Sequence, residues 1–280
     1  MSYHKILRSQ KLIALYQEGK LSKVLSRFRD YINEKNYLGA GTHAASFRYN
    51  KGEQVLKLCT KEISYFQHFP LEAVSGAPSM YGGSRSRSHA EQFKKQINLL
   101  GPYLLPVKEI LYEDNNVFVY TQDLCDRFDI SRINHDMVSK IFQMVEFLVK
   151  KNILLTDIAP NNFGLIGTRR HRQIILYDYH DLQPISVNGH QLKTSWWRGI
   201  IKNLTRYISA IYCPRKSQKY EKLMENLDLD VYLKIKKDRS LPPCYIKLLF
   251  YVLSHRQNVN EANFCQLLED CVDFLIEDRP

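Results

Sequence analysis

The chain has 280 residues, of which 44% are hydrophobic and 12% aromatic, and its formal net charge at pH 7 is +11. A chain of this length and composition is globular rather than disordered, and it can form one large domain or two lobes. Its basic charge would attract nucleotides, phosphorylated substrates, nucleic acid or anionic lipid, and the charge alone does not distinguish among them.

The sequence predicts neither a membrane span nor a cysteine framework. The longest apolar stretch, residues 245–253, is too short to cross a bilayer and contains Lys247, and the N-terminus lacks the apolar core of a secretory signal. The cysteines are scattered without a CxxC pair, which argues against zinc or disulfides and favours a reducing, cytoplasmic location. Cys265 and Cys271 fall in a helical pattern, and we expect buried, unreactive thiols there.

The first segment, residues 1–35, reads as helical. Five apolar residues recur at helical spacing and define one face, with lysines and arginines on the other side: Leu21, Val24, Leu25, Phe28 and Ile32. We expect an N-terminal helical extension that packs on the main domain.

Strands dominate the next region, residues 36–124. Gly39 and Gly41 separate two strand-like pieces, and the turn sequence YNKGE joins the second piece to an alternating strand that carries Lys57. A lysine inside an otherwise apolar strand needs a partner, because burying an unpaired charge is costly.

The same region contains one helix and a second pair of strands. Residues 91–100 have a helical pattern, and residues 104–124 predict a strand, a turn at Asp114–Asn116 and another strand. The glycine- and serine-rich stretch 75–88 reads as a flexible insert.

Helices dominate residues 125–280. The clearest is an amphipathic helix over 135–152, whose apolar face comprises Val138, Ile141, Phe142, Val145, Leu148 and Val149. A polar loop with Asp157 and Asn162 follows it, and then a strand expected over 174–182 that carries Asp178. This segregation of strands and helices predicts an α+β chain with two lobes.

Four features in this order describe a phosphoryl-transfer site: a glycine-bearing hairpin, a mid-strand lysine, an Asp-x4-Asn loop and an aspartate at the end of a strand. Glycines let backbone N–H groups approach phosphates, and a lysine supplies a positive charge. A carboxylate and an amide oxygen suit Mg²⁺, and a second carboxylate can orient the acceptor hydroxyl.

Residues 36–182 resemble the protein-kinase-like superfamily. The sequence LGAGTHAASF is similar to its glycine-rich loop, and VLKL is similar to its third strand. The resemblance implies that Gly39, Ala40 and Gly41 contact a bound nucleotide and that Lys57 anchors the phosphates.

The same resemblance assigns roles further along the chain. The sequence VYTQDL is similar to the inter-lobe hinge, which implies that Thr121 and Leu124 line the adenine of ATP. The sequences LLTDIAPNN and LYDYH are similar to the catalytic loop and the D-F-G region. They imply that Asp157 is catalytic and that Asn162 and Asp178 hold Mg²⁺.

Several residues depart from the kinase pattern. Leu155 and Thr156 replace the His-Arg pair of the catalytic loop, Ala159 stands where protein kinases usually carry lysine, and His180 replaces the glycine of D-F-G. No A-P-E motif follows. These departures also resemble the aminoglycoside and choline phosphotransferase branch.

The glutamate that would pair with Lys57 is not settled by the sequence. The usual helix pattern places Gln96 at that position, and Gln96 cannot form an ion pair. We favour Glu91, which begins the helix, over Glu62 and Glu72.

We therefore expect an ATP- and Mg²⁺-dependent phosphotransferase, first an atypical protein Ser/Thr kinase. The alternatives are a small-molecule kinase and a nucleotide-binding pseudokinase that acts as an interaction module. A basic helix face with Arg198, Lys202 and Arg206 is either solvated or binds an acidic substrate. Nucleic acid is not an expected partner, because no aromatic-basic motif supports it.

Overall fold

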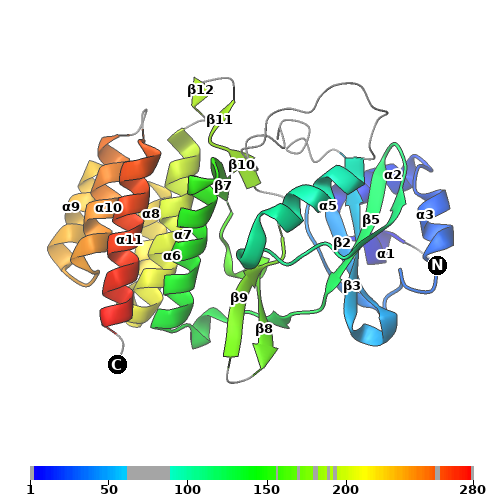
Figure 1. The fold of residues 1–280 in the computed structure, drawn as a ribbon, viewed down its shortest axis with the longest axis horizontal. Helices are drawn as coiled ribbons and strands as arrows, with labels where there is room; N and C mark the ends of the chain where they lie inside the picture. Colours follow the sequence, from blue (N-terminus) through cyan, green and yellow to red (C-terminus); the bar gives the residue numbers. More distant parts are fainter. Residues whose placement is uncertain are drawn as a thin grey trace. The chain divides into compact units, whose positions relative to one another are not determined.

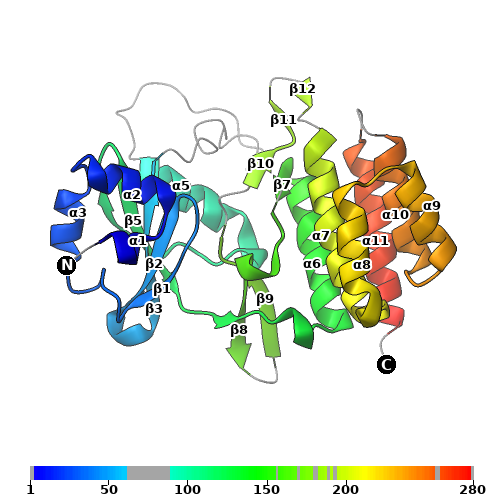
Figure 2. The ribbon, with the colours of Figure 1, turned by 180° about the vertical axis from the view of Figure 1, so that it is seen from behind.

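The fold is α+β, as expected, and is drawn from opposite sides in Figures 1 and 2. The computed structural model divides into two compact units, residues 1–125 and residues 126–280. The first unit contains the largest sheet, and the second is mainly helical. The structure describes residues 3–61, 89–155, 157–168, 171–178, 182–187, 190–191, 194–255 and 259–278.

A five-stranded antiparallel sheet organises the first unit, in the order β1-β2-β3-β5-β4. The turn between its second and third strands has positive φ at Asn50, Lys51 and Gly52, which explains the Asn and Gly of the sequence YNKGE. The strands are β1 (Tyr37–Ala40), β2 (Ala44–Tyr49), β3 (Gln54–Thr60), β4 (Glu109–Glu113) and β5 (Val117–Asp123).

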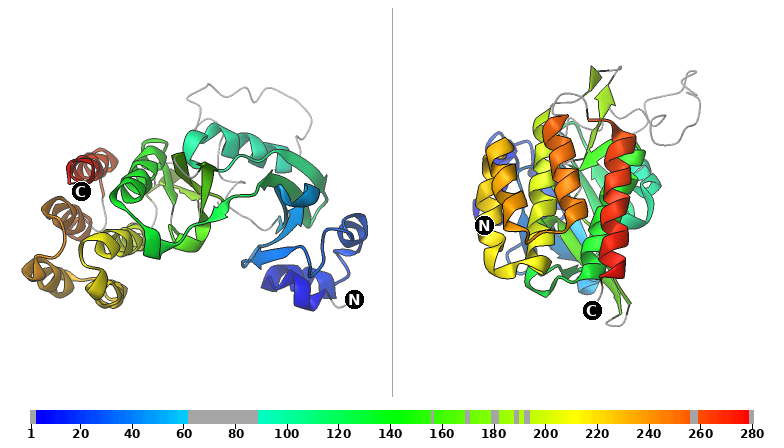
Figure 3. Two further views of the ribbon diagram at one scale, coloured as in Figure 1. Left: turned by 90° about the horizontal axis from the view of Figure 1, so that it is seen from below. Right: turned by 90° about the vertical axis from the view of Figure 1, so that its left-hand side faces the viewer.

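The N-terminal helices cover one face of this sheet, as Figure 2 and the left panel of Figure 3 show. They are α1 (His4–Leu7), α2 (Gln10–Gln17) and α3 (Ser22–Arg27). All five apolar residues predicted to share a helical face between 21 and 32 are buried. They form one core with Phe47, Leu56, Leu58, Val117 and Val119 of the strands. The helices and the sheet therefore belong to the same unit.

Helix α5 (His89–Leu99) covers the opposite face of the sheet. The Phe93 ring of this helix lies 5.2 Å from the rings of both Phe118 and Tyr120 on β5. Near the helix end, the Asn98 side chain accepts from the Val107 N–H at 2.9 Å and donates to the Val107 carbonyl at 3.1 Å. These contacts fix the side of α5 that faces the strands.

Short strands lie before and after the first long helix of the second unit. They are β6 (Asp126–Arg127), β7 (Ile153–Leu155), β8 (Phe163–Thr168), β9 (His171–Leu176), β10 (Leu182–Pro184), β11 (Ser186–Val187) and β12 (His190–Gln191). The single strand predicted over 174–182 is wrong. Strand β9 ends at Leu176 and pairs with β8, whereas β10 pairs with β7 in a separate two-stranded sheet.

The helices of the second unit pack side by side, as the right panel of Figure 3 shows. They are α6 (His135–Lys150), α7 (Thr194–Tyr212), α8 (Ser217–Glu225), α9 (Leu229–Asp238), α10 (Pro243–Ser254) and α11 (Glu261–Glu277). The Asn134 side chain caps α6 by accepting from the Met137 N–H at 2.9 Å. All six residues of the predicted apolar face of this helix are buried.

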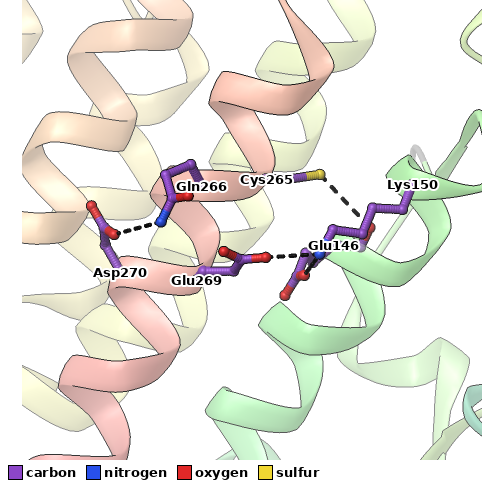
Figure 4. Close-up of polar contacts among 6 residues, drawn as sticks. All are labelled: Glu146, Lys150, Cys265, Gln266, Glu269 and Asp270. Atoms are coloured by element: carbon purple, nitrogen blue, oxygen red, sulfur yellow. Dashed lines mark hydrogen bonds and ion pairs between the residues drawn. The ribbon is translucent and has the colours of Figure 1, made fainter.

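Helices α6 and α11 are also joined by polar contacts, shown in Figure 4. The Lys150 ammonium donates to the Glu269 carboxylate at 2.7 Å and also to the Glu146 carboxylate. One turn from Glu269, the Cys265 thiol donates to the Glu146 carbonyl at 3.9 Å. These contacts stabilise the register of the two helices from outside their apolar seam.

No helix within the described residues is long and apolar enough to cross a membrane. The apolar stretch singled out in the sequence instead lies within α10, where Tyr245, Leu248, Leu249 and Val252 are buried against neighbouring helices. Its hydrophobicity is therefore explained by packing.

Candidate functional site

The loop between β7 and β8 is closed by its own side chains. The Asn162 side-chain amide donates to the Asp157 carbonyl at 3.0 Å, and the Ala159 N–H donates to Asp157 Oδ1 at 3.1 Å. Asn162 is only 5% exposed, and this hydrogen bond satisfies its buried amide. The predicted functional pair therefore also determines the shape of the loop.

Local sequence explains how this loop turns. Pro160 begins a single 3-10 turn over Pro160–Asn162, where its fixed φ suits the first position and no N–H is needed. The turn is completed by the Asn162 N–H, which donates to the Ala159 carbonyl at 3.0 Å. The backbone then enters β8 directly.

The hairpin of β8 and β9 brings the second aspartate to this loop. Phe163 pairs with Leu176, and the Tyr177 N–H donates to the Asn162 carbonyl at 3.0 Å. Asp178 is the next residue, and its Oδ1 atom is buried. Strand pairing therefore places Asp178 beside Asn162, although the two are far apart in the sequence.

Tyr207 of α7 supports the same loop from the helical side. Its ring is fully buried, and its hydroxyl donates to the Ile158 carbonyl. Burial raises the Tyr207 pKa well above its ordinary value, and the nearby Asp157 carboxylate raises it further. The sequence analysis missed this residue. The available signal was a tyrosine within an apolar helix face, since a buried tyrosine hydroxyl usually requires a partner.

The oxygen atoms beside this loop are suitable ligands for Mg²⁺. Asp178 supplies a carboxylate, and Asn162 supplies an amide oxygen because its nitrogen is already committed to the Asp157 carbonyl. Across the described ranges, no group of three or more His, Cys, Asp or Glu residues could hold a metal. A magnesium ion does not require such a group, because it retains several waters.

Lys57 is a buried, charged residue on β3 of the five-stranded sheet. It is 4% exposed and lies opposite Tyr120 in the pairing of β3 with β5. Directly opposed residues share a sheet face, and the Tyr120 ring contacts Phe93 of α5. The Lys57 side chain therefore projects toward the α5 face.

Helix α5 presents Gln96, not Glu91, to that face. Gln96 is buried and stands one turn after Phe93, whereas Glu91 is exposed with Lys94 and Lys95 on the outer side of the helix. The pairing of Glu91 with Lys57 stays a prediction. The helix pattern in the sequence had already aligned Gln96 with this position, and packing against the sheet selects that register.

The glycines of the first hairpin are not required by its backbone. Gly39 and Gly41 have ordinary φ values, and an added Cβ at either position would meet nothing within 4 Å. The hairpin turn closes through the Gly41 N–H, which donates to the Ala44 carbonyl at 2.9 Å, and Ala40 beside it is exposed. Glycine here leaves open space next to exposed backbone, which is the property a phosphate-binding loop uses.

An N-terminal residue holds this hairpin turn. The buried Ser9 hydroxyl donates to the Thr42 carbonyl at 2.7 Å and also accepts from the Leu12 N–H at the start of α2. Close by, the Arg8 guanidinium lies 5.0 Å from the Tyr37 ring centroid. The helical segment before the sheet is thus attached directly to the glycine-bearing turn.

The two predicted adenine contacts have different surroundings. Thr121 is buried opposite Leu56, on the sheet face covered by the N-terminal helices, so its side chain points away from the Lys57 face. Its carbonyl accepts from the Lys108 N–H at 2.8 Å. Leu124 is 38% exposed. Any contact of Thr121 with a nucleotide on the Lys57 face would therefore involve its backbone, whereas the Leu124 side chain is accessible; that the two residues line the adenine stays a prediction.

The structure brings Asp157, Asn162 and Asp178 together in the second unit, and it holds Lys57 and the glycine hairpin in the first. Some sequence predictions fall outside the described residues: Glu62, Glu72, the insert at 75–88, Thr156 and His180.

Comparison with protein-family models gives no match to this chain. Comparison with curated proteins gives no match either. Functional inference therefore rests on the residues and their geometry.

Proposed function

We propose that the chain is an ATP- and Mg²⁺-dependent phosphotransferase with a two-lobed, protein-kinase-like fold, which transfers the γ-phosphate to a hydroxyl. One observation carries the proposal. The Asn162 side chain and the pairing of β8 with β9 place the Asp157 loop beside Asp178, so that two carboxylates and an amide lie at one end of a hairpin. This is the set of groups that phosphoryl transfer requires.

Each residue has a distinct role in this proposal. Asp157 orients the acceptor hydroxyl and accepts its proton, with one carboxylate oxygen fixed by the Ala159 N–H. Asn162 and Asp178 would hold the metal. Lys57 supplies a positive charge for the nucleotide phosphates, and its place within a strand gives that charge little freedom to move.

When bound, Mg²⁺ would neutralise charge on the phosphates, and the protein groups then have to supply orientation. Asn162 and Tyr207 hold the carbonyls of Asp157 and Ile158, which limits the positions that the Asp157 carboxylate can adopt. Pre-organisation of this kind lowers the barrier because no reordering is needed during the reaction.

The direct test is phosphate transfer from radiolabelled ATP to protein and small-molecule hydroxyl acceptors. We expect Asp157→Ala to lower the rate by about 10²- to 10⁴-fold, the range for loss of a general acid or base, while ATP binding is retained. Asn161→Ala is the matched control, because Asn161 lies in the same loop and is exposed. Full activity of Asp157→Ala would exclude the proposed role.

A second candidate is a nucleotide-binding module without turnover. It is favoured by Gln96, which occupies the sheet-facing side of α5 and carries no charge to pair with Lys57. In the kinase-like scheme, an acidic residue from this helix aligns the lysine with the phosphates. An uncharged residue there is compatible with binding but weakens the case for efficient transfer.

Thermal unfolding with ATP, with and without Mg²⁺, separates these candidates from a chain that binds no nucleotide. Ligand at a hundred times its Kd stabilises a protein by about 2.7 kcal/mol. A metal-dependent rise in Tm together with transfer supports the enzyme, and the same rise without transfer supports the binding module. No rise at saturating ATP would reject both.

A further inference from the structure

Two helices of the second unit expose large apolar side chains. Helices α9 and α10 are joined by the short link 239–242 and lie side by side in the right panel of Figure 3. Leu229 and Leu233 of α9 are 54% and 51% exposed, and Phe250 of α10 is 46% exposed. Apolar side chains that adjoin one another on a surface, unlike single ones, mark a site that another molecule covers.

The three side chains belong to one surface because Tyr232 connects them. On α9, Leu229, Tyr232 and Leu233 stand at i, i+3 and i+4, so they share one side of the helix. The Tyr232 ring lies 5.2 Å from the Phe250 ring, which joins this side of α9 to α10. Tyr232 itself is buried and supports the others from beneath. Leu229, Leu233 and Phe250 therefore form one apolar patch.

Lysines border the apolar patch on both helices. Lys236 and Lys237 stand one turn after Leu233 on α9, and the Lys236 ammonium lies 5.9 Å from the Tyr232 ring centroid. On α10, Lys247 stands one turn before Phe250. All three lysines are exposed. The border of the patch is therefore cationic on α9 and on α10.

The carboxylates of α9 do not cancel this charge. Asp238 at the end of the helix is held by Lys216, and the Lys219 ammonium also lies 3.8 Å from its carboxylate. Asp230 is in the first turn, where the positive end of the helix compensates it. A molecule that covers the patch should therefore combine apolar groups with negative charge.

These properties select among the possible partners. A second copy of the chain, docked about a two-fold axis, would bring the same lysines together, and like charges oppose such an interface. A protein partner would have to supply matched pockets for anchor side chains, whereas leucines that project from a helix need only an apolar medium. An anionic phospholipid surface supplies both the apolar medium and the negative headgroups.

We propose that the apolar patch and its lysine border bind the surface of an anionic phospholipid membrane. The three apolar side chains enter the boundary between headgroups and acyl chains, and the three lysines contact the lipid phosphates. The contact is peripheral. It requires neither nucleotide nor phosphate transfer, so it is tested separately from the proposed function.

The first test compares vesicles of phosphatidylcholine alone with vesicles of equal parts phosphatidylcholine and phosphatidylserine. Flotation measures how much of the full-length chain each kind binds. We expect binding to the anionic vesicles only, and weaker binding as salt is raised, because salt screens the lysines. No binding to the anionic vesicles at low salt would overturn the proposal, and so would equal binding to both compositions.

Two double variants locate the contact on the protein. The leucine variant, Leu229→Ser with Leu233→Ser, should lower the affinity for the anionic vesicles about tenfold or more, because it removes apolar area that leaves water on binding. The lysine variant, Lys236→Gln with Lys237→Gln, should lower it by about fivefold for each lysine. Wild-type affinity in both variants would overturn the proposal.

Matched controls carry the same chemical changes elsewhere. Lys23→Gln with Lys35→Gln alters the net charge equally at exposed positions of the first unit, and Ile276→Ser removes an exposed apolar side chain from α11. Both controls should bind the anionic vesicles like the wild type. If the control pair of lysines lost as much affinity as the lysine variant, net charge rather than this patch would attract lipid, and the proposal would be wrong.

The leucine variant also tests the other partners. A dimer in solution that this variant dissociates, while vesicle binding is unchanged, would overturn the proposal in favour of a second copy. Binding of an acidic amphipathic peptide that the variant abolishes, again with unchanged vesicle binding, would overturn it in favour of a protein segment. Thermal unfolding checks that each variant is folded, and the wild-type comparison of the two vesicle compositions decides the proposal if one is not.

Discussion

The two units fix their candidate functional residues by different means. In the first unit, Lys57 stands in the middle of a regular five-stranded sheet, and backbone hydrogen bonds on both sides determine its position. In the second, Asp157 lies in irregular backbone that is held by the side chains of Asn162 and Tyr207. A residue within a sheet keeps its backbone position when neighbouring side chains are changed. A residue in a loop held by side-chain hydrogen bonds depends on a few individual contacts.

The largest effect on ATP affinity should come from Lys57→Met. The substitution removes the charge and keeps an apolar side chain of similar length. ATP affinity should fall by about 10- to 100-fold, the factor for a charge-assisted hydrogen bond of about 1.5–3 kcal/mol. Isothermal titration with ATP and Mg²⁺ measures the loss.

Lys61→Met is the matched control for that variant. Lys61 follows β3 and pairs with Glu113 at 2.7 Å, so its loss should leave ATP affinity unchanged. Equal loss of affinity in the two variants would mean that general positive charge, not the position of Lys57, attracts the nucleotide.

Tyr207→Phe tests the side-chain hydrogen bond that holds the Asp157 loop in the second unit. It leaves the Ile158 carbonyl buried without its donor, which should cost about 1–3 kcal/mol of stability. The rate of transfer should also fall, with little change in the KM for ATP, because the loop that carries Asp157 is loosened. Chemical denaturation and steady-state kinetics measure the two effects.

Tyr245→Phe separates the stability effect from the positioning effect. The Tyr245 hydroxyl contacts Thr205 at 2.7 Å and the Ile201 carbonyl at 3.0 Å within the helices. Its removal should destabilise the unit comparably while preserving transfer. A parallel fall of activity in both variants would show that Tyr207 acts through stability alone.

Ser9→Ala should have a smaller effect in the first unit. The substitution removes the cap of α2 and the hydrogen bond to the Thr42 carbonyl, and it should cost about 1 kcal/mol. Amide exchange of the glycine-bearing turn should become faster. Ser22→Ala is the control, because Ser22 begins α3 without contributing a side-chain cap. Unchanged amide exchange at this turn in Ser9→Ala would show that the Ser9 hydrogen bond to the Thr42 carbonyl does not hold the turn.

The smallest effect is a difference in salt dependence between two carboxyls. In the first unit, burial would raise the Asp114 pKa, but hydrogen bonds from the Asn116 and Val117 N–H groups and from Tyr112 lower it more. In the second unit, Lys216 and then Ser240 lower the Asp238 pKa to about 2.

Both carboxyls have a folded pKa below the ordinary 3.8, so their contribution to stability is present above that pH. It is lost as pH falls through the folded values. High salt should move the Asp238 pKa back toward 3.8 because its partner is an exposed cation, whereas Asp114 should move less. Carboxyl NMR titrations at two salt concentrations measure the pKa values of Asp114 and Asp238. Equal changes of the two pKa values with salt would contradict the expected difference between the two carboxyls.

Much of the fold was predictable because its causes are local. The apolar face of α6, the turn at Asn50–Gly52 and the position of Lys57 within a strand all follow from residue spacing and turn chemistry. The strand predicted over 174–182 failed because β10 pairs with β7, not with β8, and pairing partners are not encoded in local alternation.

The sequence alone determined the order of the candidate groups: glycines, Lys57, Asp157 with Asn162, and Asp178. Tertiary structure decided which side chains meet. It turned Gln96 rather than Glu91 toward the sheet, directed the Thr121 side chain to the opposite face and placed Tyr207 under the Asp157 loop. The physical reason is that periodicity identifies a face, whereas the residue opposite that face is chosen by packing between segments distant in the chain.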